Sequence, residues 1–282
     1  MKLLTWNIQW GLGMDGRVDL ARIAGEVRRL CDADVICLQE VTAGFPELKG
    51  NDGADQFAAL QALFPDYDAA SIAAVDMPGE AGRKRFGNMI LTRLPLGQVL
   101  RHTLPWDSDG VECMPRGCLE VVVTAAWGPV RVMTTHLEWS SSLLRAGQVE
   151  ALLEAQRLSA RRAIHPPTKG KGPYKTGPNA ADALLCGDFN MKPDHALIGR
   201  IQASSAPDVP AFRDTWRLVA PAEAHPPSMC LFDQVDGPTR CLDYIFVTEG
   251  LAGRVTSVGY DQTSDASDHQ AVIIELSDSA AD

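Results

Sequence analysis

The sequence predicts an α/β fold built on a mixed sheet or a pair of sheets, and three observations support this prediction. Short apolar runs bounded by turn residues recur along the chain, as expected for buried strands. Segments with apolar residues at helical spacing lie between several of these runs. Two runs flank the turn Trp127-Gly128-Pro129 with no helix between them, so we expect them to pair antiparallel.

The individual elements can be placed in chain order. Strands are predicted at the apolar runs Leu3–Ile8, Asp34–Glu40, Phe86–Thr92, Cys118–Thr124, Val130–His136, Ala183–Asp188, Leu242–Thr248 and Gln270–Leu276. Helices are predicted where apolar residues lie three or four positions apart, in Leu20–Leu30, Phe57–Phe64, Val149–Gln156 and Leu197–Ile201. The Pro, Gly and Lys content of residues 165–180 predicts a mobile loop.

A single domain spanning residues 1–282 is the expected organisation. The length of 282 residues would allow two domains, but α/β folds of about 250 residues commonly form one unit. The sequence has no internal repeat and no long hinge that would divide it. A composition of 45% hydrophobic and 22% charged residues excludes collagen-like, mostly disordered and disulfide-scaffold proteins.

The charge balance bears on the substrate. Lys and Arg number 26 against 36 Asp and Glu, a net charge of -10, which is opposite to the balance expected for electrostatic capture of nucleic acid. Basic residues gather in Arg83–Arg85 and at Lys169, Lys171 and Lys175. These clusters are either ordinary solvated loops or local attractors for an anionic substrate that flank the active site.

The cysteines and the amino terminus indicate a cytoplasmic location. The seven cysteines include no CxxC pair and lie mostly in apolar runs, as reduced, buried thiols do. The segment Met1–Asn7 stops being apolar too early for a signal peptide, and no run approaches the ~18 apolar residues of a membrane span. No protein partner can be identified from the sequence.

Polar side chains gather where the predicted strands end, which is where α/β folds usually carry their chemistry. They lie in Trp6-Asn7, Gln39-Glu40, Thr135-His136-Leu137-Glu138, Gly187-Asp188-Phe189-Asn190 and Ser267-Asp268-His269. Carboxylate and amide oxygens are hard ligands, which suit Mg²⁺ or Mn²⁺ better than zinc. The sequence therefore predicts a Mg²⁺ cofactor, with Mn²⁺ as a substitute.

Seven motifs in order resemble those of the endonuclease/exonuclease/phosphatase family, whose fold is that of pancreatic deoxyribonuclease. They are LLTWNIQWG (3–11), DVICLQEV (34–41), GNMILT (87–92), THLE (135–138), GDFNMKP (187–193), LDYIFVT (242–248) and SDHQAV (267–272). The resemblance implies a four-layer α/β sandwich, in which two packed mixed sheets are flanked by helices. It places the active site at one edge of the sheet pair.

The resemblance also implies a role for each matching residue. Glu40 matches the metal-binding carboxylate, with Asn7 beside it and Asp268 as a further residue of the metal site. Asp188 and Asn190 match the pair that orients or deprotonates the attacking water. A single Asp or Asn at such a position is more often a cap or an Asx turn, so the assignment depends on the motifs together.

Two histidines match those of the family. His269 matches the histidine oriented by a carboxylate, here Asp243, because such a partner fixes the tautomer and raises the basicity of the imidazole. His136 matches a histidine of the nuclease and sphingomyelinase-like branches, which abasic-site endonucleases lack. Its orienting carboxylate is left open among Asp76, Glu80 and Glu138.

A few further residues have two interpretations each. Arg116 is a candidate for phosphate binding as a bidentate donor, or else an exposed arginine in a turn. Trp10 and Trp139 follow two of the motifs and would stack a base or sugar, or simply pack at the rim. The remaining histidines, His102, His165, His195 and His225, and the acids Asp261 and Asp265 are expected on the surface.

The implied function is metal-dependent hydrolysis of a phosphoester by in-line attack of water, with a phosphodiesterase or nuclease favoured. The substrate would be a nucleic acid or a small phosphodiester. The alternatives are a phosphomonoesterase acting on a small metabolite and a non-catalytic binding module of the same fold. The binding module predicts missing acids or histidines at the motif positions, and all of these residues are present.

Overall fold

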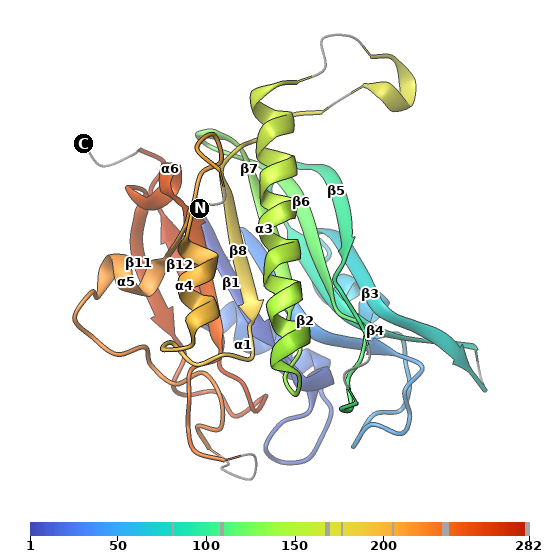
Figure 1. Cartoon of the computed structure of the whole chain (residues 1–282). Coiled ribbons are helices and arrows are strands. Elements are labelled where there is room, and N and C mark those ends of the chain that lie inside the picture. Colours follow the sequence, from blue (N-terminus) through green and yellow to red (C-terminus); the bar gives the residue numbers. More distant parts are fainter. Residues whose placement is uncertain are drawn as a thin grey trace.

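The structure is a computed structural model that describes residues 1–80, 82–107, 110–166, 170–175, 177–204, 206–232 and 237–279. Two six-stranded mixed sheets pack face to face, and helices cover their outer faces (Figure 1). This is the four-layer α/β sandwich implied by the resemblance, and the expectation is confirmed.

The first sheet has the strand order β11-β12-β1-β2-β4-β3. Its strands are β1 (Lys2–Asn7), β2 (Val35–Ala43), β3 (Asp68–Gly79), β4 (Gly82–Thr92), β11 (Val255–Tyr260) and β12 (Val272–Leu276). Strand β1 is parallel to β2 and antiparallel to β12. The parallel pair therefore ends at a common edge, where Asn7 is the register partner of Gln39.

The second sheet has the order β5-β6-β7-β8-β10-β9. Its strands are β5 (Leu96–Thr103), β6 (Gly117–Ala125), β7 (Gly128–His136), β8 (Ala183–Asp188), β9 (Phe212–Asp214) and β10 (Asp243–Thr248). Strands β6 and β7 pair antiparallel around the predicted turn, which confirms that expectation. Strands β7 and β8 are parallel, and His136 is the register partner of Asp188 at their shared end.

The predicted helices are all present. The helical segments are η1 (Gln9–Gly11), α1 (Leu20–Leu30), α2 (Gln56–Leu63), α3 (Ser142–Ile164), η2 (Gly172–Tyr174), α4 (Ala196–Gln202), α5 (Thr215–Val219) and α6 (Glu249–Ala252). Side chains cap the longer helices, since Asp19, Asp55 and Ser141 each accept a hydrogen bond from a backbone N–H of the first turn. Helices α1 and α2 pack on the first sheet, and α3 and α4 pack on the second.

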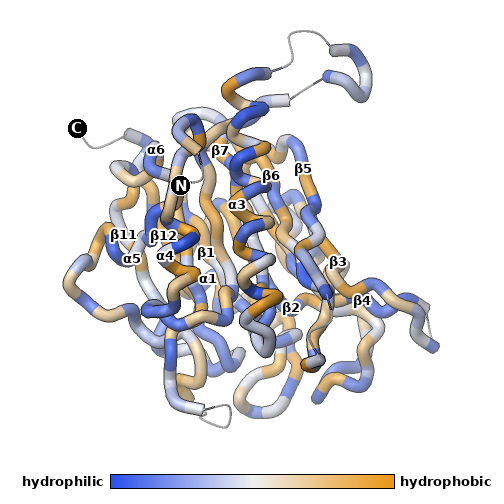
Figure 2. Tube along the Cα trace, in the orientation of Figure 1, coloured by the Kyte–Doolittle hydropathy of each residue, from blue (hydrophilic) through white to orange (hydrophobic). Residues whose placement is uncertain are grey.

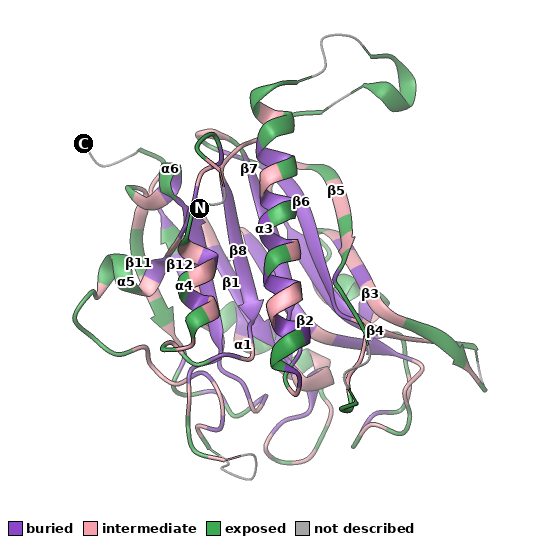
Figure 3. Ribbon diagram, in the orientation of Figure 1, coloured by how far each residue is buried: buried purple, intermediate pink, exposed green. Residues whose placement is uncertain are grey.

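The sequence patterns missed strands β3, β5, β9 and β11. Strands β3, β5 and β11 lie at or next to a sheet edge and are half exposed along much of their length, as the colouring in Figure 3 shows for β3 and β5. Strand β9 is only three residues long. Such strands lack the continuous apolar run that identifies a buried central strand.

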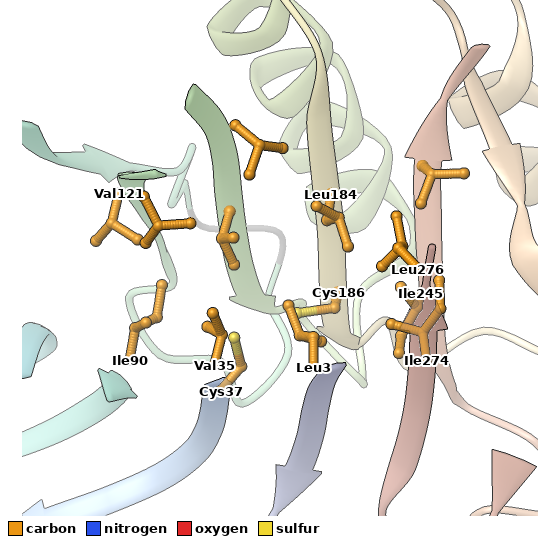
Figure 4. Close-up of a cluster of buried hydrophobic side chains, with 14 of the residues drawn as sticks. Leu3, Val35, Cys37, Ile90, Val121, Leu184, Cys186, Ile245, Ile274 and Leu276 are labelled. Atoms are coloured by element: carbon orange, nitrogen blue, oxygen red, sulfur yellow. The ribbon is translucent and has the colours of Figure 1, made fainter. Parts of the chain in front are cut away.

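The main core lies between the two sheets (Figure 4). Side chains from both sheets meet there, among them Leu3, Cys37, Leu184 and Cys186, and all four are fully buried. Figure 2 shows the same organisation, because hydrophobic segments run along the central strands and hydrophilic ones gather in the loops. The buried Cys37 and Cys186 are free thiols, as expected from their apolar surroundings.

A buried ion pair joins β6, β7 and α3 on the outer face of the second sheet. Arg131 is completely buried, and its Nη1 lies 3.3 Å from Oε1 of Glu120. The guanidinium also donates to the carbonyl oxygen of Ala180 at 2.7 Å and to the side chain of Gln156. Glu120 in turn lies 2.7 Å from Nε2 of His102, which was expected on the surface and is half-buried in this contact.

Glu120→Gln should lower the free energy of unfolding by about 3–5 kcal/mol, because it leaves the buried charge of Arg131 without its counter-charge. The measurement is urea denaturation of the wild type and the variant. Glu275→Gln on the exposed face of β12 is the matched control, and it should change stability by no more than about 0.5 kcal/mol. Equal stability of the two variants would contradict the structural role given to Glu120.

The described residues of the predicted loop 165–180 lie at the end of the sandwich opposite the motif residues. Helix α3 starts beside the end of β7 and runs along the sheet, so the segment after it leads to the start of β8, five residues before Asp188 (Figure 1). Residues 167–169 and 176 of this loop are outside the described residues. Lys171 and Lys175 therefore do not flank the motif residues, which excludes the alternative of a local attractor at the active site for these two residues and leaves that of an ordinary solvated loop.

The second basic cluster is neutralised by acids. Arg83, Lys84 and Arg85 on β4 form ion pairs with Asp76, Glu47 and Asp55, respectively. These exposed pairs leave little positive charge for attracting a polyanion. Within the described part of the chain, no helix is both long and apolar enough to cross a membrane.

Candidate active site

The ends of the two central parallel pairs bring the motif residues together. Asn7 ends β1 and lies between two carboxylates: its Nδ2 donates to Oε1 of Glu40 at 3.0 Å and to Oδ2 of Asp188 at 3.2 Å. Asn7 belongs to the first sheet and Asp188 to the second. The site therefore spans the edge of both sheets, as the resemblance implies.

A β-bulge turns Glu40 toward this edge. Leu38 pairs with Met89 and Val41 with Gly87, so Gln39 and Glu40 together oppose the single residue Asn88. Glu40 has a φ of 60°, in the left-handed region that a glutamate rarely adopts. Asn88 itself donates to the carbonyl oxygen of Gly117 at 3.1 Å, so it links the two sheets.

Backbone strain concentrates at this site. Among the described residues, those other than glycine with positive φ are Gln9, Trp10, Glu40, Asn190 and Cys230. Trp10, Glu40 and Asn190 line the same cavity, and Gln9 and Cys230 both hydrogen-bond to Asp268. Strained conformations persist where the surrounding structure enforces them, and they occur preferentially at functional sites.

A glycine allows β7 and β8 to approach closely beside the site. Gly187 has a φ of +129°, and a Cβ on it would lie 2.0 Å from the carbonyl oxygen of Thr135. The next residue, Asp188, is thereby held against the end of β7. The carboxylate of Asp188 also accepts the N–H of Asn190 at 2.9 Å, and Nδ2 of Asn190 donates to the carbonyl oxygen of Leu137 at 3.0 Å.

His269 is held by two carboxylates. Its Nδ1 lies 2.8 Å from Oδ2 of Asp243, and its Nε2 lies 3.7 Å from Oδ2 of Asp188. Ser228 fixes Asp243 by donating its hydroxyl to the same oxygen at 2.7 Å. Burial favours a neutral imidazole, but the charges of Asp243 and Asp188 outweigh it and raise the pKa of His269 well above its usual value. His269 is therefore an imidazolium at neutral pH.

His136 has the opposite charge state. Burial, together with the positive charges of Arg116 and His269, lowers the pKa of His136 well below its usual value, so its imidazole is neutral. Its Nε2 lies 3.4 Å from Oδ2 of Asp188 and its Nδ1 3.9 Å from Oε1 of Glu40. Its Nδ1 has no hydrogen-bond partner within the described structure.

The carboxylates expected to orient His136 do not contact it in the described structure. Asp76 pairs with Arg83 on the hairpin, and Glu80 is exposed in the turn that follows. Glu138 turns toward Arg116, whose Nε lies 3.5 Å from its Oε2. The carboxylates nearest to His136 are instead Asp188 and Glu40, which come from strands distant in sequence.

Arg116 is the basic group that the site contributes for an anion. It is only 5% exposed, so it is not the exposed turn arginine of the alternative interpretation. Its Nε and Nη1 have no hydrogen-bond partner in the described structure, although both are buried. Buried guanidinium N–H groups are costly to leave unpaired, and they line the cavity that also contains Asp188. This arrangement fits a phosphoryl oxygen as the missing acceptor.

The acidic residues fit a divalent cation. Burial and the neighbouring carboxylate of Asp268 raise the pKa of Glu40 to about 7. Burial also raises the pKa values of Asp188 and Asp268. The neighbouring charge of His269 lowers the pKa values of Asp188 and Asp268 but does not outweigh burial, and a hard divalent cation would supply the missing positive charge.

A second group of potential ligands overlaps this set. The ligand atoms of Asp188, Asp243 and His269 all lie within 4.8 Å of one another. Because Nδ1 of His269 is engaged with Asp243 and the ring is protonated, this triad is better suited to proton and charge relay than to metal binding. Glu40 and Asp268 remain the better cation ligands.

Seven of the predicted site residues line a cavity of about 650 Å³, whereas Asn7 and Asp243 are not among its lining residues. Sequence reasoning identified its polar residues, Glu40, Arg116, His136, Asp188, Asn190, Asp268 and His269, and its rim tryptophans Trp10 and Trp139. It missed Met229, Arg240 and an apolar wall formed by Phe45, Leu48, Val75, Met77, Phe86 and Met114. Half-exposed apolar residues in edge strands and loops resemble ordinary surface residues in sequence, so no local pattern would have identified the wall.

Two other surface expectations are wrong. The side chain of His225 is only 1% exposed, and its Nε2 lies 2.7 Å from Oδ2 of Asp214. Asp261 is 8% exposed and accepts hydrogen bonds from Thr263 and Ser264. In both cases a hydrogen-bond partner offsets the loss of hydration when the polar group is buried, and the spacing of residues in the sequence does not reveal this partner.

Comparisons with known proteins bear on the family and on the fold of the chain. The model of the Endonuclease/Exonuclease/phosphatase family matches residues 4–269. The comparison with curated protein sequences gives no match. Among solved structures, a humanized D. rerio TDP2 is 17% identical with a TM-score of 0.63, and the alignment covers 97% of each chain.

Two further solved structures are similar over nearly the whole chain. The human Nocturnin catalytic domain with bound sulfate is 16% identical, with a TM-score of 0.64 over 98% of this chain and 93% of that one. The mannosyl-6-phosphatase Bt3783 of Bacteroides thetaiotaomicron is 17% identical, with a TM-score of 0.65 over 98% and 99%. At such low identities the likeness shows the fold alone.

Proposed function

The chain belongs to the endonuclease/exonuclease/phosphatase family of phosphoester hydrolases, and from this premise we propose that it is a Mg²⁺-dependent phosphodiesterase. The observation that supports this most directly is the buried guanidinium of Arg116, whose Nη1 has no hydrogen-bond partner in the described structure, in the same cavity as Asp188 and His269. These groups supply an anion-binding donor, a carboxylate and an imidazolium around one space.

The proposed mechanism is attack of water on phosphorus in line with the leaving oxygen. Asp188 and Asn190 hold the attacking water, and the raised pKa of Asp188 makes its carboxylate a better proton acceptor than an ordinary aspartate. The imidazolium of His269, fixed by Asp243, donates a hydrogen bond to a phosphoryl oxygen as negative charge develops there. Arg116 binds a second phosphoryl oxygen.

His136 and the acids of the metal site complete the assignment. His136 is neutral and therefore can donate one hydrogen bond, either to a phosphoryl oxygen or to the leaving group. Glu40, Asp268 and the Asn7 amide would hold Mg²⁺, or Mn²⁺ in its place. When bound, the cation supplies charge neutralisation at the phosphoryl and leaving oxygens.

The proposed substrate is a diester, either a nucleic acid or a small phosphodiester. The motif around His136 supports this, because it resembles that of the nuclease and sphingomyelinase-like branches of the family. A monoester carries close to two negative charges at neutral pH and a diester carries one, so a comparison of the two kinds of ester separates the candidates.

The proposal extends to the whole chain and its location. We take residues 1–282 as one functional domain, because residues from both ends, Asn7 and His269, meet at the site. Buried free thiols such as Cys37, Cys118 and Cys186 support the reducing cytoplasm as the location.

Hydrolysis of bis-para-nitrophenyl phosphate and of the para-nitrophenyl monoester tests the proposed function. With Mg²⁺ or Mn²⁺, kcat/KM for the diester should exceed that for the monoester by at least about tenfold, and chelation of the metal should abolish both activities. A preference for the monoester would instead support a phosphomonoesterase. Hydrolysis of neither compound, together with absence of Mg²⁺ binding, would support a non-catalytic binding module.

A further inference from the structure

The active-site cavity has one apolar wall that the chemistry of phosphoester hydrolysis does not require. It is formed by Phe45, Leu48, Val75, Met77, Phe86 and Met114, which we call the apolar wall. Catalytic groups such as Asp188 and His269 line the same cavity. A group attached to the bound phosphorus therefore has this wall within reach.

The hairpin of β3 and β4 is built to present the wall to the cavity. Ile72 pairs with Asn88 and Val75 pairs with Phe86, with an irregular register between Ala73 and Val75. The extra residue keeps Val75 on the side of the sheet that Ile72 faces, and Met77, two residues on, follows it. The inner apolar face of β3 thus continues beyond the core into the cavity.

The loop after β2 supplies the rest of the wall in a defined arrangement. Gly44 has a φ of +76°, and a Cβ there would lie 2.6 Å from the carbonyl oxygen of Arg83, so the loop packs closely on β4. This places the ring of Phe45 edge-on to that of Phe86, with centroids 6.4 Å apart. Nζ of Lys84 lies over the Phe45 ring and pairs with Glu47, so its charge is already satisfied.

The polar content of the cavity argues against a highly charged occupant on this side. Among the described residues, its lining includes no lysine, and its arginines are Arg116 and Arg240. Arg116 lies against Glu138, and Arg240 donates to the carbonyl oxygen of Pro238. Met77 nevertheless remains 46% exposed, an apolar surface that a substrate group would cover.

We infer that the substrate is a phosphoester carrying an uncharged apolar organic group, which binds against the apolar wall while the phosphate occupies the catalytic centre. This inference rests on the proposed function and narrows its substrate class. An aliphatic chain and an aromatic ring share this chemistry. The thioether side chains of Met77 and Met114 adapt to either shape.

The test measures binding of phosphates that carry a single substituent, in the presence of Mg²⁺, by calorimetry. The Kd of hexyl phosphate should be at least about tenfold lower than that of methyl phosphate, because each added methylene group is transferred from water to the apolar wall. Phenyl phosphate distinguishes an aromatic from an aliphatic preference. A Kd for thymidine 5′-phosphate lower than those of hexyl and phenyl phosphate would overturn the inference in favour of a nucleotide group.

A double variant tests whether the dependence of Kd on chain length arises at the apolar wall. The double variant Val75→Thr with Met77→Gln keeps the shape and charge of the wall but adds polar atoms to it. The Kd of methyl phosphate should then exceed that of hexyl phosphate by less than about threefold. Leu158→Gln is the matched control, because Leu158 is 48% exposed on α3 and does not line the cavity. The control should keep the wild-type ratio. An unchanged ratio in the double variant would overturn the inference.

The outcomes separate this inference from the proposed function. If the protein hydrolyses the diester but Kd does not depend on chain length, the phosphodiesterase proposal is supported and the apolar subsite is contradicted. If Kd depends on chain length but neither para-nitrophenyl ester is hydrolysed, the apolar subsite is supported and the phosphodiesterase proposal is contradicted.

Discussion

Asp188→Asn should lower kcat/KM for the diester by at least about 1,000-fold while the protein stays folded. The substitution removes the proton acceptor of the proposed mechanism and one of the two carboxylates that keep His269 protonated. Both effects act on the chemical step. We therefore expect a fall in kcat with little change in KM.

The fold should tolerate this change. Burial raises the pKa of Asp188, so ionisation of this carboxyl weakens the folded state at neutral pH, and a neutral amide removes that cost. The carbonyl oxygen of the new side chain can still accept the N–H of Asn190, but its NH₂ group then faces Nδ2 of Asn7, which donates to Asp188 in the wild type. Because these effects oppose each other, the melting temperature should stay close to that of the wild type.

The matched control for this experiment is Asp66→Asn, at an exposed aspartate in the turn before β3. It should keep wild-type kinetics. A folded Asp188→Asn protein with wild-type turnover would disprove the role of Asp188, whereas an unfolded one would show that the carboxylate is structural.

Glu40→Gln should abolish stabilisation by Mg²⁺ and lower kcat/KM by at least about 1,000-fold. The carboxylate has a pKa raised to about 7 by burial and by Asp268, so it is poised to bind a cation in place of a proton. For the wild type, Mg²⁺ at about 100 times its Kd should stabilise the fold by roughly 2.7 kcal/mol. The neutral amide is a weaker ligand and should lose most of this effect.

Thermal melting with and without Mg²⁺ measures this loss independently of catalysis. Glu150→Gln is the control, because Glu150 is exposed on α3 and pairs with Arg200. It should show the same Mg²⁺-dependent shift in Tm as the wild type. If Glu40→Gln also kept that shift, the metal site would have to be assigned to other residues, of which Asp188, Asp243 and His269 form the next candidate set.

Much of the fold follows from local patterns. Central strands such as β1 and β8 are continuous apolar runs, and α1 has an apolar stripe and an Asp19 cap, so each is recognisable without knowledge of its neighbours. The edge strands β3 and β11 are half exposed and have no such run. Their existence depends on pairing with β4 and β12, which the tertiary structure provides.

The candidate site was predictable to a similar extent. Its polar residues follow strand ends, so their motifs mark them in the sequence, and the structure brings Asn7, Glu40 and Asp188 into contact. The sequence could not reveal the environment of each group. Arg116 is buried and His225 is paired because segments distant in sequence cover them.

By itself, the sequence determined the order of the central elements, the family and the identity of the polar residues at the strand ends, since each depends on short-range patterns. The tertiary structure alone decided the charge states of His269 and His136, because these depend on burial and on charges from other strands. It also brought together the residues of the apolar wall, which come from a loop, a hairpin and the segment before β6. Long-range packing creates such environments, and no local pattern encodes them.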